Sequence, residues 1–191
     1  MFRSVCLLIV VLFVAACGDK SEKQPDVSTV KVKLNSQRLD LDMLKLDTNH
    51  LAEGLVQLKQ QYPDFLNFYL DTLIGLGLNG QYADSSRAIR EGLRSFLTFP
   101  DYRNLYDTVS AHYPSTDKID EDLAKGFQYL QHYYPGYKTP RIIYFVGYLA
   151  NWGVVSYEGV IGIGLDMFLG EQYPYYASVG QPAYMYINFR P

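Results

Sequence analysis

The sequence predicts an α+β domain in which a helical array packs on a small, mostly antiparallel sheet. Apolar residues between positions 49 and 134 recur every three or four residues, which is the period of amphipathic helices. Residues 29–34 alternate between apolar and polar, and residues 141–165 are rich in β-branched and aromatic side chains, as strands are. We therefore assign the helices to the middle of the chain and the sheet to the two flanking segments.

The helical part is expected to contain a series of short helices separated by proline and glycine. Asn49 is suited to cap the first helix, and Pro63 ends it because proline cannot continue the hydrogen-bond ladder. Pro100 opens another helix, since a first-turn proline loses no hydrogen bond there. The predicted helices span residues 49–62, 64–74, 84–96, 100–109 and 117–134.

The predicted sheet takes its centre from residues 141–147, which are apolar without alternation, as a strand covered on both faces would be. Residues 159–165 form a partner strand whose glycines permit close backbone approach. A turn region at residues 151–153 separates the two segments, so we expect them to form a hairpin. Asp166 follows the second strand directly, which places its carboxylate near an end of the sheet.

The N-terminus has the pattern of a lipoprotein export signal over residues 1–16. An apolar run too short to span a bilayer follows a single positive charge, and it ends in Val-Ala-Ala before Cys17. This segment resembles a bacterial lipobox, in which the cysteine receives lipid and becomes the new N-terminus. We expect Cys17 to carry lipid, residues 17–28 to form a flexible tether, and residues 29–191 to form one domain.

The composition of the chain excludes further classes of function. Removal of residues 1–16 from the 191 leaves 175 residues, enough for one sizeable core. Loss of Arg3 changes the formal net charge from −3 to −4, which argues against a nucleic-acid partner. Cys6 leaves with the signal and Cys17 carries lipid, so the body has no thiol for a disulfide, metal or nucleophile. The 18 tyrosines and 10 phenylalanines suit a core and surface built from large rings.

The sequence contains none of the catalytic motifs that we compared with it. The histidines at positions 50, 112 and 132 do not form the His-Glu-x-x-His spacing that binds zinc on one helix face. There is also no Gly-x-Ser-x-Gly elbow and no phosphate-binding glycine loop. We therefore predict no metal, no cofactor and no catalytic residue, and we favour a protein that is not an enzyme.

Acidic residues near the strands allow two interpretations. Asp40 and Asp42 could begin a metal site, but no third ligand lies nearby, and an ion pair between Arg38 and an acid that stabilises the turn is favoured. Asp166 and Glu171 could form a carboxylate pair. We favour instead a structural role in which Asp166 accepts hydrogen bonds from nearby backbone N–H groups.

The residues just described also resemble a known family. Arg38-Leu39-Asp40, the lipobox, and above all the segment from Gly162 to Pro174 are similar to the gliding-motility lipoprotein GldB family of Bacteroidetes. The resemblance covers most of the mature chain. Because members usually continue through further helices beyond the point reached at Pro191, we expect a shortened member. The family also looks distantly like predicted zincin-like metallopeptidases, which implies an incomplete zincin-like fold.

The resemblance implies a lipid-anchored cell-envelope protein of gliding motility and its associated secretion machinery, on the outer rather than the inner membrane. The domain would lie in the periplasm or at the cell surface. We expect it to act without catalysis, by binding envelope proteins through an aromatic groove or sheet edge near Asp166, Tyr173 and Tyr175. Two alternatives stay open: a zincin-like hydrolase whose zinc motif lies beyond residue 191, and a glycan-binding lipoprotein suggested by tyrosines and Trp152. The sequence leaves the oligomeric state open.

Overall fold

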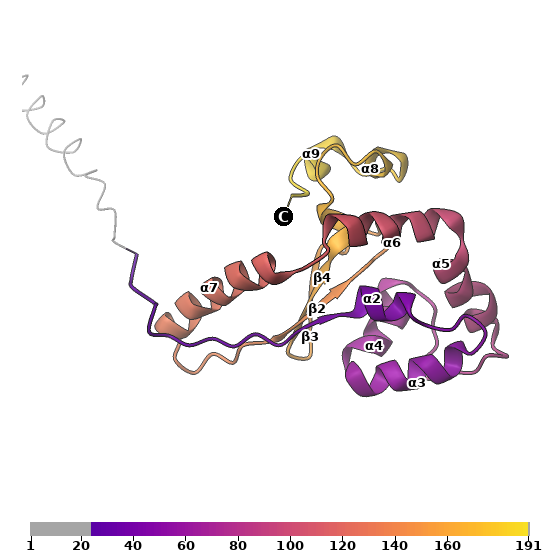
Figure 1. Ribbon diagram of the computed structural model, residues 1–191, viewed down its shortest axis with the longest axis horizontal. Helices are drawn as coiled ribbons and strands as arrows, with labels where there is room; N and C mark the ends of the chain where they lie inside the picture. The colour runs from indigo at the N-terminus through magenta and orange to yellow at the C-terminus, as the bar shows by residue number, and fades with distance from the viewer. Residues whose placement is uncertain (1–23, 191) are drawn as a thin grey trace, which may run out of the picture.

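The computed structural model describes residues 24–190 and shows a mixed α+β fold, as predicted (Figure 1). The predicted signal segment, Cys17 and the tether up to residue 23 lie outside the described residues. Where the predicted tether is described, Val27 is buried and the neighbouring residues lie along the last long helix. Packed residues therefore begin before position 29.

The described residues form a four-stranded sheet with the order β1-β2-β4-β3. Its strands are β1 (Ser36–Arg38), β2 (Arg141–Phe145), β3 (Val154–Tyr157) and β4 (Val160–Gly164). β2 is central, as predicted, but it pairs in parallel with both β1 and β4, and only the β3–β4 pair is antiparallel. The prediction of a mostly antiparallel sheet was wrong, because local patterning reports how buried a strand is and not which strand lies beside it.

The predicted hairpin between residues 141–147 and 159–165 is also wrong, since these segments run parallel. The hairpin is formed by β3 and β4, which are joined by Glu158 and Gly159 with φ angles of 45° and 74°. Positive φ at both central residues is what a type I′ hairpin turn requires. β3 was missed because this short edge strand is exposed at alternate residues and carries only a weak apolar pattern.

Thr29 lies in a turn and residues 30–34 belong to no strand, so the first strand begins only at Ser36. The alternation did predict the side chains correctly, because Val32 and Leu34 are half-buried while Lys31 and Lys33 are exposed. The strand ladder does not include residues 29–34 because the partner strand β2 begins only at Arg141. The carbonyl of Val30 instead accepts a hydrogen bond from the Gln128 side chain at 2.9 Å.

The predicted helices are all present. They correspond to α3 (Leu51–Gln61), α4 (Phe65–Phe68) with the π-helical turn η1 (Tyr69–Leu73), η2 (Ala88–Leu93) with α5 (Arg94–Thr98), α6 (Pro100–His112) and α7 (Asp117–Tyr133). Shorter elements that the pattern did not separate are α2 (Leu39–Leu44), η3 (Leu165–Phe168), α8 (Tyr175–Ser178) and α9 (Ala183–Tyr186). The predicted Asn49 cap does not form. Asp84, from a distant segment, accepts the Ala52 N–H at 2.9 Å instead.

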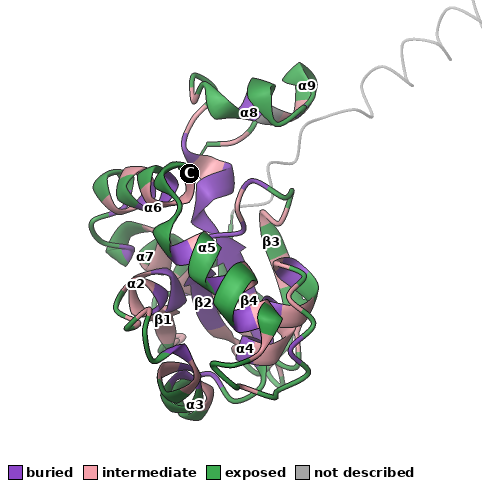
Figure 2. Cartoon of the chain, turned by 90° about the vertical axis from the view of Figure 1, so that its right-hand side faces the viewer, coloured by how far each residue is buried: buried purple, intermediate pink, exposed green. Residues whose placement is uncertain are grey.

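The sheet separates two apolar cores, and Figure 2 shows β2 and β4 buried between the surrounding helices. Ile143 and Phe145 face the core made with α3, α4 and α5, whereas Ile142, Tyr144 and Val146 face the core made with α6 and α7. This alternation follows from the period of two along a strand. A Cβ on the β4 glycine Gly162 would lie 2.6 Å from the ring of Phe65, so the predicted close approach is confirmed.

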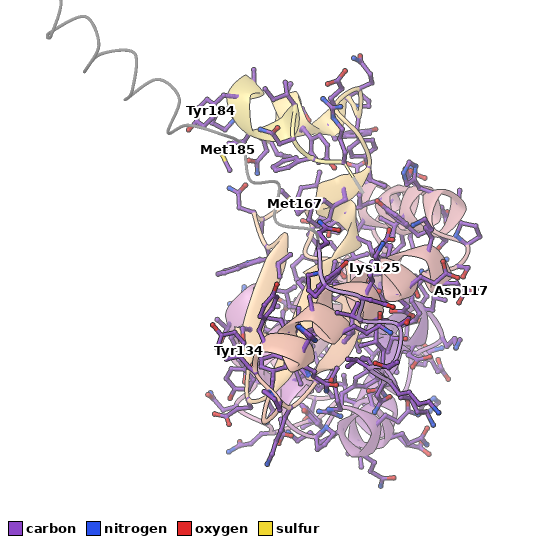
Figure 3. The ribbon with its side chains drawn as sticks, turned by 90° about the vertical axis from the view of Figure 1, so that its left-hand side faces the viewer. Asp117, Lys125, Tyr134, Met167, Tyr184 and Met185 are labelled. Atoms are coloured by element: carbon purple, nitrogen blue, oxygen red, sulfur yellow. The ribbon has the colours of Figure 1, made fainter. Side chains whose placement is uncertain are left out.

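The last described residues form a small lobe of α8 and α9 beside the end of the sheet (Figure 3). Tyr184 is 72% exposed and Ile187 is 45% exposed, so this lobe leaves apolar side chains at the surface. None of the helices within residues 24–190 combines the length and apolar character needed to cross a membrane.

Candidate functional site

A cleft of about 340 Å³ opens between the start of α6, the segment after β2 and the α8 lobe. Among the described residues four tyrosines line it, together with three aliphatic side chains, one carboxylate and one hydroxyl. We call it the tyrosine cleft. It is lined by Asp101, Tyr102, Leu105, Tyr148, Leu149, Tyr173, Tyr175, Ser178 and Val179.

Tyr148 forms the inner wall of the cleft, within a cluster of rings. Its ring packs on Phe96 with centroids 4.4 Å apart, and it meets Tyr102 and Tyr106 edge to face at 5.0 and 5.8 Å. Pro100 occupies the first turn of α6 and so sets the point from which Tyr102 and Tyr106 project, one turn apart. These edge-to-face contacts hold the aromatic wall in one arrangement.

The backbone that presents Tyr148 is strained. Tyr148 and Leu149 have φ angles of 55° and 60°, in the left-handed region that residues with a Cβ rarely adopt. Asp166 compensates for this backbone strain, because its carboxylate accepts hydrogen bonds from the N–H of Gly147 at 2.9 Å and of Leu149 at 2.7 Å. On the other side, the Gln181 amide donates to the Leu149 carbonyl at 3.1 Å. The segment is therefore held from two elements at once.

Asp166 is fully buried, and this burial raises its pKa to about 6, even though the two backbone donors favour the charged form. Its own carbonyl accepts a hydrogen bond from the Tyr176 hydroxyl at 2.8 Å. The same hydroxyl accepts from the N–H of Leu169 at 2.9 Å. Asp166 thus joins the segment after β2 to α8, and these two elements form opposite walls of the cleft.

A second group of polar atoms lies behind Tyr148. The hydroxyls of Tyr106 and Tyr148 are 3.0 Å apart, and the Tyr69 hydroxyl donates to the Val146 carbonyl at 3.0 Å. Burial raises the pKa of Tyr106 to about 12, and it also raises the pKa values of Tyr69 and Tyr148. These phenols stay neutral at physiological pH, where they act as hydrogen-bond donors and acceptors.

The structure brings together two of the three residues predicted as a binding surface. Tyr173 and Tyr175 line the cleft with ring centroids 5.5 Å apart, and Tyr175 is 49% exposed. Asp166 does not reach the surface. Its predicted place there is corrected, because its carboxylate is turned inward to the backbone N–H groups. The predicted alternative, a carboxylate that accepts backbone hydrogen bonds, is what the structure shows.

Sequence reasoning missed Tyr102 and Tyr148. Tyr102 lies inside the predicted helix of residues 100–109, and Tyr148 follows a buried strand, so neither stands out from the other tyrosines. The useful signal was Gly147 before two large residues, which marks an abrupt end to the strand. No local pattern shows that the next two residues adopt positive φ.

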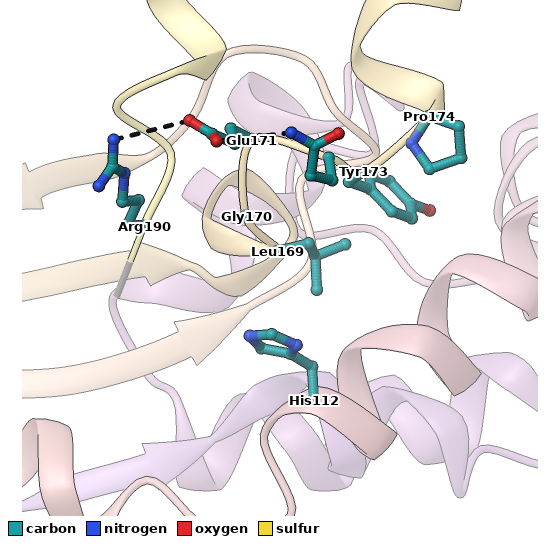
Figure 4. Close-up of a pocket in the computed structure, with 8 residues that line it drawn as sticks. His112, Leu169, Gly170, Glu171, Tyr173, Pro174 and Arg190 are labelled. Carbon is teal, nitrogen blue, oxygen red and sulfur yellow. Dashed lines mark hydrogen bonds and ion pairs between the residues drawn. The ribbon is translucent and has the colours of Figure 1, made fainter.

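A second hollow, of about 580 Å³, lies on the other side of Tyr173 (Figure 4). Figure 4 shows the His112 imidazole at the end of α6 facing the loop of residues 169–174. Glu171 pairs there with Arg190 at 3.6 Å. Because Glu171 is exposed and Asp166 is buried, the two do not form the carboxylate pair considered from the sequence.

Arg38 confirms the prediction of an ion pair at the turn after the first strand. Its guanidinium binds both carboxylate oxygens of Asp40, at 2.9 and 2.7 Å, and donates to the Tyr113 carbonyl at 3.0 Å. Asp42 accepts the Tyr62 hydroxyl at 2.7 Å. Within residues 24–190 no three His, Cys, Asp or Glu side chains are grouped so as to hold a metal ion.

The three histidines are exposed and lie at separate places in the fold. His50 precedes α3, where it pairs with Asp47 at 2.9 Å. His112 ends α6, and His132 lies in the last turn of α7. They therefore do not share a helix face.

Comparison with known proteins identifies one relationship. A family model described as "Gliding motility protein GldB" matches residues 20–191. No curated protein and no solved structure matches the chain. Nothing in these comparisons supports the likeness to zincin-like metallopeptidases.

Proposed function

This chain belongs to the family of the gliding motility protein GldB, and we propose that it is a lipid-anchored envelope protein that binds other envelope proteins in the tyrosine cleft. On this proposal its contribution to gliding, and to the associated secretion machinery, is noncatalytic.

The observation that carries the proposal is the way in which Tyr148 is held. Two successive left-handed residues cost roughly 1–2 kcal/mol each, and residues strained in this way concentrate at functional sites. Here the strain is supported by Asp166, whose raised pKa reflects the cost of burying its charge. The result is an open cleft with preorganised rings, the type of surface at which a few aromatic side chains provide most of the binding energy.

The anchor would be lipid on Cys17, and the polar residues that follow would let the domain stand away from the membrane surface. We propose the outer membrane as its location. An anchored domain meets partners that lie in the same membrane or beside it, so even a small cleft can act at high local concentration. This suits a protein that assembles with others in the envelope.

Gliding itself provides the test. In a strain whose own copy is deleted, the full chain should restore colony spreading, whereas Tyr175→Ala should reduce it strongly although the protein accumulates normally. Tyr134→Ala is the matched control, because Tyr134 is also exposed, at 66%, but follows α7 and is not part of the cleft (Figure 3). Normal spreading of the Tyr175 variant would contradict the role of the cleft.

The anchor is tested in the same strain. Cys17→Ser should shift the protein from the membrane fraction to the soluble fraction and should abolish spreading. Fractionation with membranes in spite of this change would count against lipid on Cys17.

The same tyrosines are also compatible with glycan binding, since sugar rings stack on aromatic faces. The lining favours protein over glycan, because only Asp101 and Ser178 add polar side chains to the rings. Dependence of cell-wall sugar binding on Tyr175 would reverse this preference.

A further inference from the structure

We infer that the tyrosine cleft accepts an extended segment of a partner protein that carries an arginine or lysine next to a proline or another apolar residue. This inference rests on the proposed function and specifies the kind of partner.

The charge of the lining is the first argument. Asp101 is the only charged side chain among the residues that line the cleft, and it is exposed at the rim. Within the described part of the chain, no lysine, arginine or histidine forms an ion pair with it. A cationic side chain of a partner would supply the complementary charge, whereas an acidic partner would be repelled.

The rings give the second argument. The faces of aromatic rings carry negative potential and attract Lys or Arg when the cation lies within about 6 Å of the ring centre. The rings of Tyr173 and Tyr175 lie together on one wall, and those of Tyr102 and Tyr148 lie on the other. A basic side chain between these walls would keep its apolar stem against the rings while its head reaches Asp101.

The apolar part of the cleft lining favours an extended segment. Leu105, Leu149 and Val179 leave apolar surface between the tyrosines, which suits the flat ring of proline or a small aliphatic side chain. Proline-rich segments bind aromatic-lined grooves because they are already extended and lose little conformational entropy. Tyrosine hydroxyls at the cleft edge can donate to the free carbonyls of such a segment.

The experiment is a selection of random peptides on the purified full chain, followed by affinity measurements for the selected peptides. Recovered peptides should carry Arg or Lys beside proline or an apolar residue. Asp101→Asn should weaken their binding about fivefold, the upper end of what an exposed ion pair contributes. Asp107→Asn is the control, because it removes the same charge from an exposed position of α6 outside the cleft.

The outcomes distinguish failure of this inference from failure of the proposal that the tyrosine cleft binds protein partners. The basic-segment inference is overturned if the recovered peptides are neutral or acidic, or if they bind Asp101→Asn as tightly as the unchanged protein. The proposal of binding in the cleft would still stand in that case, provided that Tyr175→Ala abolishes peptide binding. If no recovered peptide depends on Tyr175, both ideas fail. Rising salt should weaken binding of the basic peptides, since the Asp101 contribution is screened at the rim.

Discussion

Asp166 provides the sharpest test, since it connects the stability of the fold to the architecture of the cleft. Replacing Asp166 with asparagine should remove a pH dependence of folding stability that the unchanged protein has. The expected direction is unusual for an aspartate, because this carboxyl group gains stability from protonation rather than losing it.

The magnitude follows from the burial of the carboxyl. Its pKa is about 6 in the folded chain against 3.8 for an exposed aspartate, so folding takes up a proton between these values. The stability contributed by the neutral form is fully present below about pH 3.8 and is lost as the pH rises through about 6. At roughly 1.4 kcal/mol per pH unit, this amounts to on the order of 3 kcal/mol.

The asparagine variant lacks this titration, but its free energy of unfolding is lowered by an amount that does not depend on pH. An amide offers one acceptor oxygen where the carboxylate offers two, so the N–H of Gly147 or Leu149 loses its partner. One buried N–H without a partner costs about 1–3 kcal/mol at any pH. The difference in unfolding free energy between the unchanged protein and the variant should therefore grow by about 2.4 kcal/mol from pH 7 to pH 4, most of the full effect.

Urea unfolding followed by fluorescence measures this difference. Trp152 is the single tryptophan of the chain, and its indole N–H donates to the Leu73 carbonyl at 3.1 Å, so it reports on loss of packing beside the sheet. Other acidic groups titrate in both proteins and cancel in the comparison. A difference that stays constant between pH 7 and pH 4, or that shrinks on acidification, would refute the reasoning.

Two further predictions concern stability. Gly164→Ala should destabilise the chain by about 3 kcal/mol or more, because its Cβ would collide with the backbone carbonyl of Trp152; Gly126→Ala, in an open helical position, should instead stabilise by about 0.5–1 kcal/mol. Equal urea midpoints for the two variants would contradict this. Arg38→Met should cost about 3–5 kcal/mol by leaving the buried Asp40 unpaired. Lys118→Met, which breaks an exposed pair, should leave the melting temperature unchanged and so serves as the control.

The helices could be predicted because their signals are local. The apolar stripe of α3 and the prolines around α6 act within one or two turns, and the structure has these helices within a few residues of the expected bounds. The Arg38–Asp40 pair was predictable for the same reason, since its partners are two residues apart. The cap of α3 was not, because Asp84 comes from a segment more than thirty residues away.

The candidate site was predicted only in part. Tyr173 and Tyr175 stood out because they follow a strand end in a segment dense in rings, and the structure places both in the cleft. Their partners on the facing wall, Tyr102 and Tyr148, come from elsewhere in the chain. No spacing rule links them to α8.

By itself, then, the sequence determined the helix positions, the buried central strand and the family, and it predicts a lipid anchor at Cys17. The tertiary structure decided that β2 and β4 run parallel, that Asp166 faces inward, and that four tyrosines enclose a cleft. The physical reason is the distance along the chain over which each effect acts. Periodicity and turn residues act over a few positions, whereas strand order and the orientation of a buried carboxylate depend on which distant segments exclude water together.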